Sequence, residues 1–288
     1  MLARTLAGLA AARATTPSPV VLVPTMGALH EGHRALLRRA RVAAGSGGSV
    51  VASVFVNPLQ FGAGEDLERY PRSLDRDVRI CAAEGADVVF APRSDQMYPG
   101  RQQVTVDPGP VGRVLEGACR PALFGGALTV VLKLFHLVGP DAAVFGEKDA
   151  QQLFLVRAMT ADLNIPVEII GVPTVREADG LAASSRNAYL TPGQRERARA
   201  LPRALRAGAD AAEAGGDADA VLAAARAELG PLAGADPPLR LDYLALADPA
   251  TFGDLPERYR GPALLLVAAR VGDTRLIDNV TVRIGSQT

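Results

Sequence analysis

Several residue types are scarce in this 288-residue sequence, and each shortage excludes a class of protein. Tryptophan is absent, and the two cysteines, Cys81 and Cys119, form neither a C-x-x-C pair nor a disulfide framework. This usage fits a reducing compartment. No apolar run is long enough to span a membrane, and residues 1–13 lack the apolar core of a signal peptide. We therefore expect a cytoplasmic protein without a membrane partner.

Net charge is also lacking. The 31 basic and 31 acidic residues cancel, so no global field favours nucleic acid or an anionic membrane as a partner. Only two of the basic residues are lysines, Lys133 and Lys148. A compact ammonium differs from a planar guanidinium in a tight phosphate or carboxylate pocket. Each lysine is therefore a candidate site residue, with chance as the alternative.

Apolar runs alternate with helical patterns along the first half of the chain. Strand-like runs cover residues 20–23, 50–55, 88–90, 142–145 and 167–172, and helical patterns cover 33–44, 74–84, 128–137 and 149–163. This βαβ order predicts an α/β fold with a Rossmann-like doubly wound parallel sheet, whose ligand crevice lies at the carboxyl ends of the strands. The later residues favour a smaller C-terminal α+β lid domain. The expected domains are 1–176 and 177–288.

Two of the three histidines, His30 and His33, lie at the start of a predicted helix directly after the first strand. Free N–H groups and the positive end of the helix dipole favour a polyphosphate there, and Gly32 lets it approach the backbone. The expected ligand is a nucleotide. An H-x-x-H spacing alone is a weak signal, and the alternative is that His33 caps the helix while His30 is a loop residue. Zinc is disfavoured because no third ligand stands nearby.

Other polar clusters follow other strands of the predicted sheet. Residues 57–61 follow the second strand, and residues 146–149 follow the strand that ends at Phe145. These clusters converge on one rim, as a ligand site requires. Near the domain boundary, residues 184–186 (Ser-Ser-Arg) offer hydroxyl donors and a guanidinium fork to phosphate. For this loop alone, a helix cap and a surface ion pair are the alternative.

Asp75 and Asp77 lie at the start of the predicted helix 74–84, close to the same rim. Magnesium bound to a triphosphate takes one or two carboxylates, so either aspartate is a candidate ligand. The alternative is that both carboxylates complement the dipole of their own helix.

Five motifs, taken together and in order, resemble the pantothenate synthetase family of the HxGH nucleotidyltransferase superfamily. They are residues 24–33 (PTMGALHEGH), 55–61 (FVNPLQF), 70–72 (YPR), 145–152 (FGEKDAQQ) and 184–190 (SSRNAYL). The resemblance implies a ligase that joins pantoate to β-alanine through a pantoyl adenylate, while ATP becomes AMP and pyrophosphate. It also implies Mg²⁺ and a homodimer.

The same resemblance assigns roles to individual residues. The catalytic residues would be His30, His33, Lys148 and Arg186. ATP would contact these four residues together with Pro24, Thr25, Met26, Gly146, Asp149, Ser184 and Ser185. Gln60 and Gln152 would bind pantoate, Asn57 and Gln60 would bind β-alanine, and Asp77 would hold Mg²⁺.

Two positions depart from the family pattern. Ala183 stands where a methionine usually precedes the two serines, and residues 120–124 (RPALF) resemble an Arg-Pro-Gly-His-Phe stretch in which Leu123 replaces the histidine. Two alternatives to the ligase therefore stay open. One is an HxGH nucleotidyltransferase with a different acceptor, which the neutral amides of the predicted acid site argue against. The other is a catalytically weakened nucleotide-binding homologue.

Overall fold

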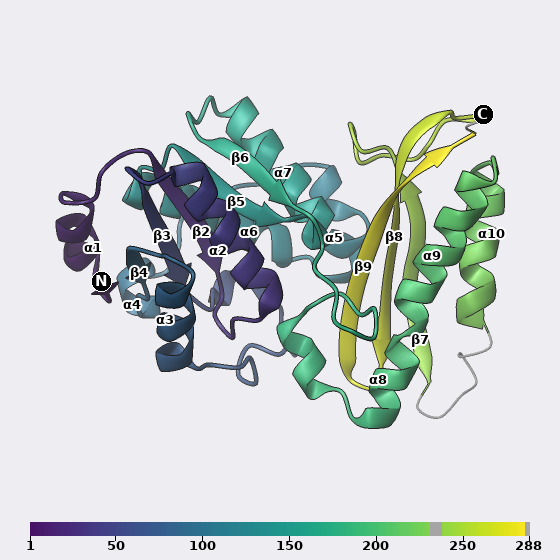
Figure 1. The fold of residues 1–288 in the computed structure, drawn as a ribbon, viewed down its shortest axis with the longest axis horizontal. Coiled ribbons are helices and arrows are strands. Elements are labelled where there is room, and N and C mark those ends of the chain that lie inside the picture. The colour runs from purple at the N-terminus through teal and green to yellow at the C-terminus, as the bar shows by residue number, and fades with distance from the viewer. Residues whose placement is uncertain (231–237, 286–288) are drawn as a thin grey trace. The chain divides into compact units, whose positions relative to one another are not determined.

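The computed structural model describes residues 1–230 and 238–285. The chain forms two compact units, Met1–Val175 and Arg176–Thr288, which divide one residue before the predicted boundary. In the first unit (Figure 1) the strands are β1 Leu2–Ala3, β2 Val20–Thr25, β3 Ser49–Val54, β4 Val88–Phe90, β5 Ala142–Gly146 and β6 Glu168–Val172. The helices are α1 Leu6–Arg13, α2 Glu31–Ala44, α3 Leu74–Ala83, α4 Ser94–Met97, α5 Glu116–Cys119, α6 Leu123–Val138 and α7 Ala150–Asp162.

The six strands of the first unit form one parallel sheet in the order β1-β4-β3-β2-β5-β6, which confirms the predicted fold class. The chain proceeds from β2 outward to β3 and β4, and then returns to add β5 and β6 on the other side of β2. The direction of winding therefore reverses between β2 and β5. In open α/β sheets such a switch point opens a crevice at the carboxyl ends of the strands.

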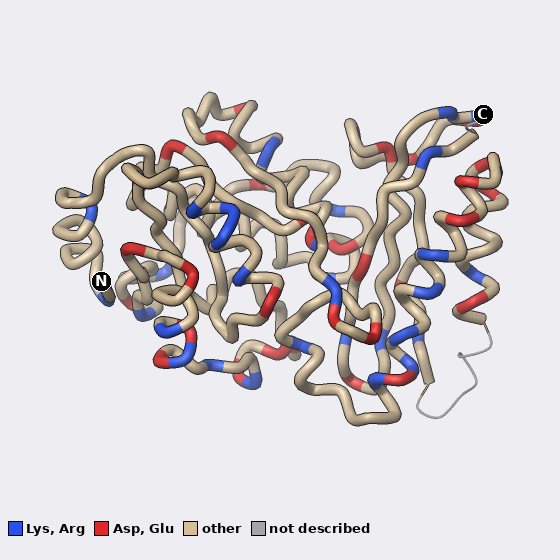
Figure 2. Tube along the Cα trace, in the orientation of Figure 1, with Lys and Arg blue, Asp and Glu red and all other residues tan. Residues whose placement is uncertain are grey.

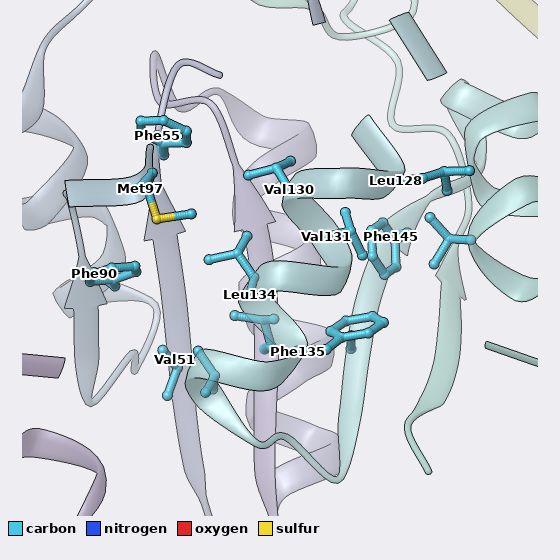
Figure 3. Packing of buried hydrophobic residues seen from close by; sticks show 14 of the residues in the cluster. Val51, Phe55, Phe90, Met97, Leu128, Val130, Val131, Leu134, Phe135 and Phe145 are labelled. Carbon is cyan, nitrogen blue, oxygen red and sulfur yellow. The ribbon is translucent and has the colours of Figure 1, made fainter. Parts of the chain in front are cut away.

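Apolar side chains cover both faces of this sheet. On one face, α6 packs Val130 and Leu134 toward the strands, and Val51 and Phe145 belong to the same cluster (Figure 3). On the other face, α2 and α3 form a second cluster with the remaining strand residues. The central strands are therefore buried on both sides, which explains their nearly continuous apolar runs.

Helix α6 begins five residues earlier than predicted, at Leu123 instead of Leu128. Gly125 and Gly126 lie in its first turns, and glycine disfavours helices, so the sequence pattern did not predict this start. Gly126 is required by packing, because a Cβ atom there would lie 2.1 Å from the carbonyl oxygen of Leu59. The close approach brings α6 against the loop that follows β3.

The second unit is α+β, as predicted. Its strands β7 Leu239–Ala247, β8 Gly261–Val271 and β9 Thr274–Ile284 form an antiparallel sheet in that order. Its helices are α8 Pro192–Ala198, α9 Ala200–Glu213 and α10 Ala218–Leu229. Apolar residues of α9 and α10, among them Leu201, Leu205 and Val221, share one core with Leu265 and Val267 of β8.

Acidic and basic residues are interspersed along both units in the view of Figure 2, in keeping with the zero net charge. Among the described residues, no helix combines the length and the apolar character needed to cross a membrane.

Candidate active site

Three loops with polar residues follow the central strands of the first unit at their carboxyl ends. His30 and His33 come after β2, Asn57 and Gln60 come after β3, and Lys148 comes after β5. Strand β2 lies between β3 and β5, so these loops are neighbours around the switch point.

The side chains of the two histidines form a capping box at the first turn of α2, which we call the histidine turn. His30 is the N-cap of the helix, and its Nδ1 accepts a hydrogen bond from the backbone N–H of Gly32 at 3.2 Å. The Nδ1 atom of His33 accepts the backbone N–H of His30 at 3.3 Å. The ring centroids are 4.1 Å apart. An imidazole that accepts at Nδ1 carries its proton on Nε2, so each ring presents an Nε2–H donor. Capping and ligand binding, which the sequence left as alternatives, are thus compatible.

Burial and two neighbouring charges set the protonation state of His33. Burial, followed by the charges of His30 and Lys148, lowers the pKa of His33 to about 3. His33 is therefore neutral at neutral pH and keeps its Nε2 proton as a donor. Lys148 follows β5, and its ammonium is close enough to His33 for its charge to lower the pKa of that imidazole. The Lys148 side chain is 20% exposed, with its Nζ 4.0 Å from a carboxylate oxygen of Asp149.

Asp77 supports the loop that carries the histidines. Its side chain, 1% exposed, accepts the backbone N–H of Ala28 at 3.0 Å on one oxygen and that of Leu29 at 2.9 Å on the other. The loop needs this support, because Gly27 and Ala28 have positive φ angles of 83° and 52°. A Cβ atom on Gly27 would lie 3.0 Å from an Asp77 oxygen. Asp77 therefore fixes the backbone entering α2.

This geometry gives Asp77 a structural role that the sequence did not indicate, because each of its oxygens accepts a backbone N–H group. The role of Asp77 as an Mg²⁺ ligand stays a prediction. Within the described residues, no three His, Cys, Asp or Glu side chains gather as a metal site.

Asn57 also lies behind the site instead of on its surface. The side chain is fully buried, and its Nδ2 donates to Gly126 O and to Gln60 Oε1, both at 3.0 Å. Its Oδ1 accepts from the backbone N–H of Leu59 at 3.3 Å and from the Tyr98 hydroxyl at 2.9 Å. These four hydrogen bonds use the whole amide. They do not fit the predicted direct contact of Asn57 with β-alanine.

Gln60 is placed differently from Asn57. Its Oε1 accepts from Asn57, while its Nε2 makes no hydrogen bond within the described residues and is not fully buried. Gln60 can therefore donate to a ligand.

The two adjacent glutamines of α7 have separate environments. Gln151 is buried and donates to the carbonyl oxygens of Val111 and Val114, while its own oxygen accepts the N–H of Glu116. The partly exposed Gln152 makes no hydrogen bond within the described part of the chain. Gln152 is thus the one available to a ligand.

The remaining predicted nucleotide residues of the first unit line the ends of β2 and β5. Pro24 and Thr25 end β2, and Met26 follows. The Thr25 hydroxyl donates to Ser53 O at 2.7 Å and accepts the N–H of Gly27, so it ties β2 to β3. Gly146 ends β5, and Asp149 precedes α7 with about half of its side chain exposed.

Ser184, Ser185 and Arg186 belong to the second unit. The Ser184 hydroxyl accepts the backbone N–H of Arg186 at 3.3 Å and caps a short 3₁₀ helix, Ser185–Tyr189. Asn187 braces the loop by donating to Glu177 at 2.6 Å and to Ala182 O at 3.1 Å. The helix cap considered from the sequence is therefore present for Ser184, and its hydroxyl hydrogen can still be donated.

Both departures from the family pattern lie at buried positions. Leu123, 9% exposed, begins α6 and joins the apolar cluster beside Phe124. Ala183 is 5% exposed, directly before the serines.

Two contributors to the site were missed from the sequence. Tyr98 reaches Asn57 from the end of α4, and nothing in its local sequence distinguishes it. Arg120 bonds Glu65 through Nε at 2.9 Å and through Nη2 at 2.5 Å, and its Nη2 also reaches Gln60 O at 3.3 Å. Its motif, RPALF, stands out in the sequence only for the missing histidine.

Comparison with known proteins points to one family. The sequence profile described as Pantoate-beta-alanine ligase matches residues 2–281. The chain is similar to the pantothenate synthetase of Thermobifida fusca, with 60% identity over 267 residues that cover 91% of this chain and 88% of that protein.

Solved structures agree. The crystal structure of pantothenate synthetase from Thermus thermophilus matches with a TM-score of 0.89 at 49% identity, covering 97% of this chain and 98% of that one. The pantoate-beta-alanine ligase from Francisella tularensis, crystallised with Beta-gamma ATP and Beta-alanine, matches with a TM-score of 0.78 at 31% identity and covers 97% of each chain.

Proposed function

This chain belongs to the pantoate-beta-alanine ligase family, and from that premise we propose that it condenses pantoate with β-alanine through a pantoyl adenylate. A pantoate carboxylate oxygen attacks the α-phosphorus of ATP, and the bond to pyrophosphate breaks. The β-alanine nitrogen then attacks the acyl carbon, AMP leaves, and the nitrogen loses a proton. Family membership favours this ligase over a nucleotidyltransferase with another acceptor.

The observation that carries the phosphate assignment is the capping box that His30 and His33 form at the start of α2. Two rings that each accept a backbone N–H at Nδ1 lie at a helix N-terminus, and His33, whose pKa is lowered by burial and by the charges of His30 and Lys148, is the neutral one. Attack on the α-phosphorus concentrates negative charge, which preorganised donors and a cation stabilise. We assign His30, His33 and Lys148 to this task. Arg186, Ser184 and Ser185 would add donors from the second unit.

The rest of the nucleotide would lie along the ends of β2 and β5. We assign adenosine contacts to Gly146 and Asp149, and further ATP contacts to the backbone and side chains of residues 24–26. The position of these residues on both sides of the switch point supports the assignment.

The two acids would be oriented by neutral amides. Within the described residues, neither the Nε2 of Gln60 nor the amide of Gln152 makes a hydrogen bond, which supports pantoate binding by hydrogen bonds that do not trap its charge. Gln60 would also face β-alanine, while Asn57 acts behind it. Mg²⁺ would be held near the phosphates, with Asp77 as the predicted protein ligand.

The experiment that tests the proposal is exchange of labelled pyrophosphate into ATP. Exchange should require pantoate but not β-alanine, whereas AMP release at full rate should require both acids, because adenylation precedes amine attack. Exchange that proceeds without pantoate would contradict this order. A weakened nucleotide-binding homologue would bind ATP without exchanging pyrophosphate.

We also propose a cytoplasmic homodimer. Two free cysteines, one of them exposed, are compatible with a reducing compartment. The dimer rests on the family resemblance, and light scattering during gel filtration would test it.

A further inference from the structure

The amide pair behind the predicted pantoate site is oriented by unambiguous partners. The Leu59 N–H can only donate, and the Gly126 carbonyl can only accept. Together they fix which end of the Asn57 amide is oxygen and which is nitrogen. Asn57 must then donate to Gln60, so the Gln60 atom facing it is oxygen. The donor that remains for a ligand, Nε2 of Gln60, is therefore set by Asn57.

One further residue completes this arrangement. The Tyr98 hydroxyl donates to Asn57 Oδ1 at 2.9 Å, although the two residues are 41 positions apart in the sequence. This bond is shorter than the 3.3 Å bond from the Leu59 N–H to the same oxygen. Tyr98 therefore makes the closer of the two hydrogen bonds that hold the Asn57 oxygen in place.

The Tyr98 ring is itself held in position. Its centroid is 6.1 Å from that of Phe55, with the rings tilted by 54°. Lys133 of α6 places its Nζ 5.6 Å from the Tyr98 centroid, within cation–π range. Burial raises the pKa of Tyr98 to about 12, so the hydroxyl keeps its proton as a donor at any working pH. A rigid ring with a protonated hydroxyl suits a positioning role.

We propose that Tyr98 is a positioning residue for pantoate recognition, which orients the Gln60 amide through Asn57. The inference rests on the proposed binding of pantoate by Gln60. Tyr98 itself touches neither substrate nor ATP in this scheme. Its loss should therefore affect pantoate binding without affecting the nucleotide or the chemical step.

Steady-state kinetics of Tyr98→Phe test the proposal. Loss of one hydrogen bond that orients the donor should raise KM for pantoate about 3- to 10-fold, while KM for ATP and kcat stay within about twofold. The matched control is Tyr259→Phe in the second unit, which removes a hydroxyl that donates to Pro262 O at 2.7 Å. A merely destabilised enzyme would lose kcat through its inactive fraction and keep its KM. That outcome, or an unchanged pantoate KM, would overturn the proposal.

Calorimetric titration with pantoate distinguishes a failure of the Tyr98 proposal from a failure of the proposed pantoate binding by Gln60. If Gln60→Ala leaves pantoate affinity unchanged, the assignment of Gln60 fails, and the role of Tyr98 fails with it. If Gln60→Ala weakens binding but Tyr98→Phe does not, only the Tyr98 proposal fails. The proposal expects both single variants to bind pantoate weakly. In the double variant, Tyr98→Phe should add less than about a twofold further loss, because the amide it orients is gone.

Discussion

Replacing Asp77 by asparagine distinguishes a loop-supporting carboxylate from a metal ligand. Wild-type Asp77 accepts one backbone N–H on each oxygen, at 3.0 and 2.9 Å, with the side chain 1% exposed. Asparagine keeps one acceptor and turns an NH₂ group toward the second backbone N–H. The variant therefore loses one charge-assisted hydrogen bond and leaves a buried donor unsatisfied.

The structure sets the size of the expected effect. A hydrogen bond to a charged group contributes about 1.5–3 kcal/mol, and an unsatisfied buried donor costs about 1–3 kcal/mol. Since these contributions overlap, we expect a loss of about 2–4 kcal/mol, or roughly 5–15 °C in the Tm of a first unit that spans Met1–Val175. Because the loop after β2 carries the donors at His30 and His33, kcat should fall by roughly 10- to 100-fold.

The assay combines thermal unfolding with a magnesium titration of pyrophosphate exchange. We expect a lower Tm, a lower kcat and an unchanged Mg²⁺ concentration for half-maximal rate. Asp75→Asn is the matched control, since Asp75 is exposed in the first turn of the same helix, and its stability should change by less than about 1 kcal/mol. A variant at Asp77 that keeps its Tm but needs about tenfold more Mg²⁺ would refute the reasoning.

Three further predictions concern the charge and shape of the site. Lys148→Ala and His30→Ala should each lower kcat by about 10²-fold or more without unfolding the protein, and Lys133→Ala should do much less; equal damage from Lys133→Ala at unchanged Tm would mean that the wrong lysine was assigned. Leu123→His should raise kcat/KM for pantoate severalfold, because the imidazole restores a hydrogen bond worth about 0.5–1.5 kcal/mol. If the variant instead uses pantoate no better, and the wild type prefers longer branched dihydroxy acids, the substrate is another acid. His33 has a folded pKa of about 3, below its ordinary 6.5, so unfolding takes up a proton as the pH falls; the free energy of unfolding should therefore drop by up to about 2 kcal/mol from pH 7 to pH 5, and His33→Gln should remove that part of the slope in denaturant titrations.

The sequence alone determined the architecture and the place of the two histidines at the start of α2. Strand β4 was predicted at its observed bounds, and β2 and β5 within one or two residues, because strands buried on both faces are apolar throughout. The start of α2 was marked by residues that follow each other directly, from Gly27 to His33. A helix N-terminus is a local structure, so its capping residues and its preference for anions can be predicted from neighbouring positions.

Only the tertiary structure decided which polar side chains have all their hydrogen bonds satisfied inside the fold and which keep a donor unused among the described residues. Asp77 carries a carboxylate, as metal ligands do, and Asn57 carries an amide that can bind a substrate. The family resemblance assigned them those roles. Their partners in the fold are Ala28 and Gly126, which lie 49 and 69 positions away. Such partners are brought together by sheet order and by the close packing of α6 on the loop after β3. A buried polar group must satisfy its hydrogen bonds wherever the fold places it, and sequence spacing does not contain that information.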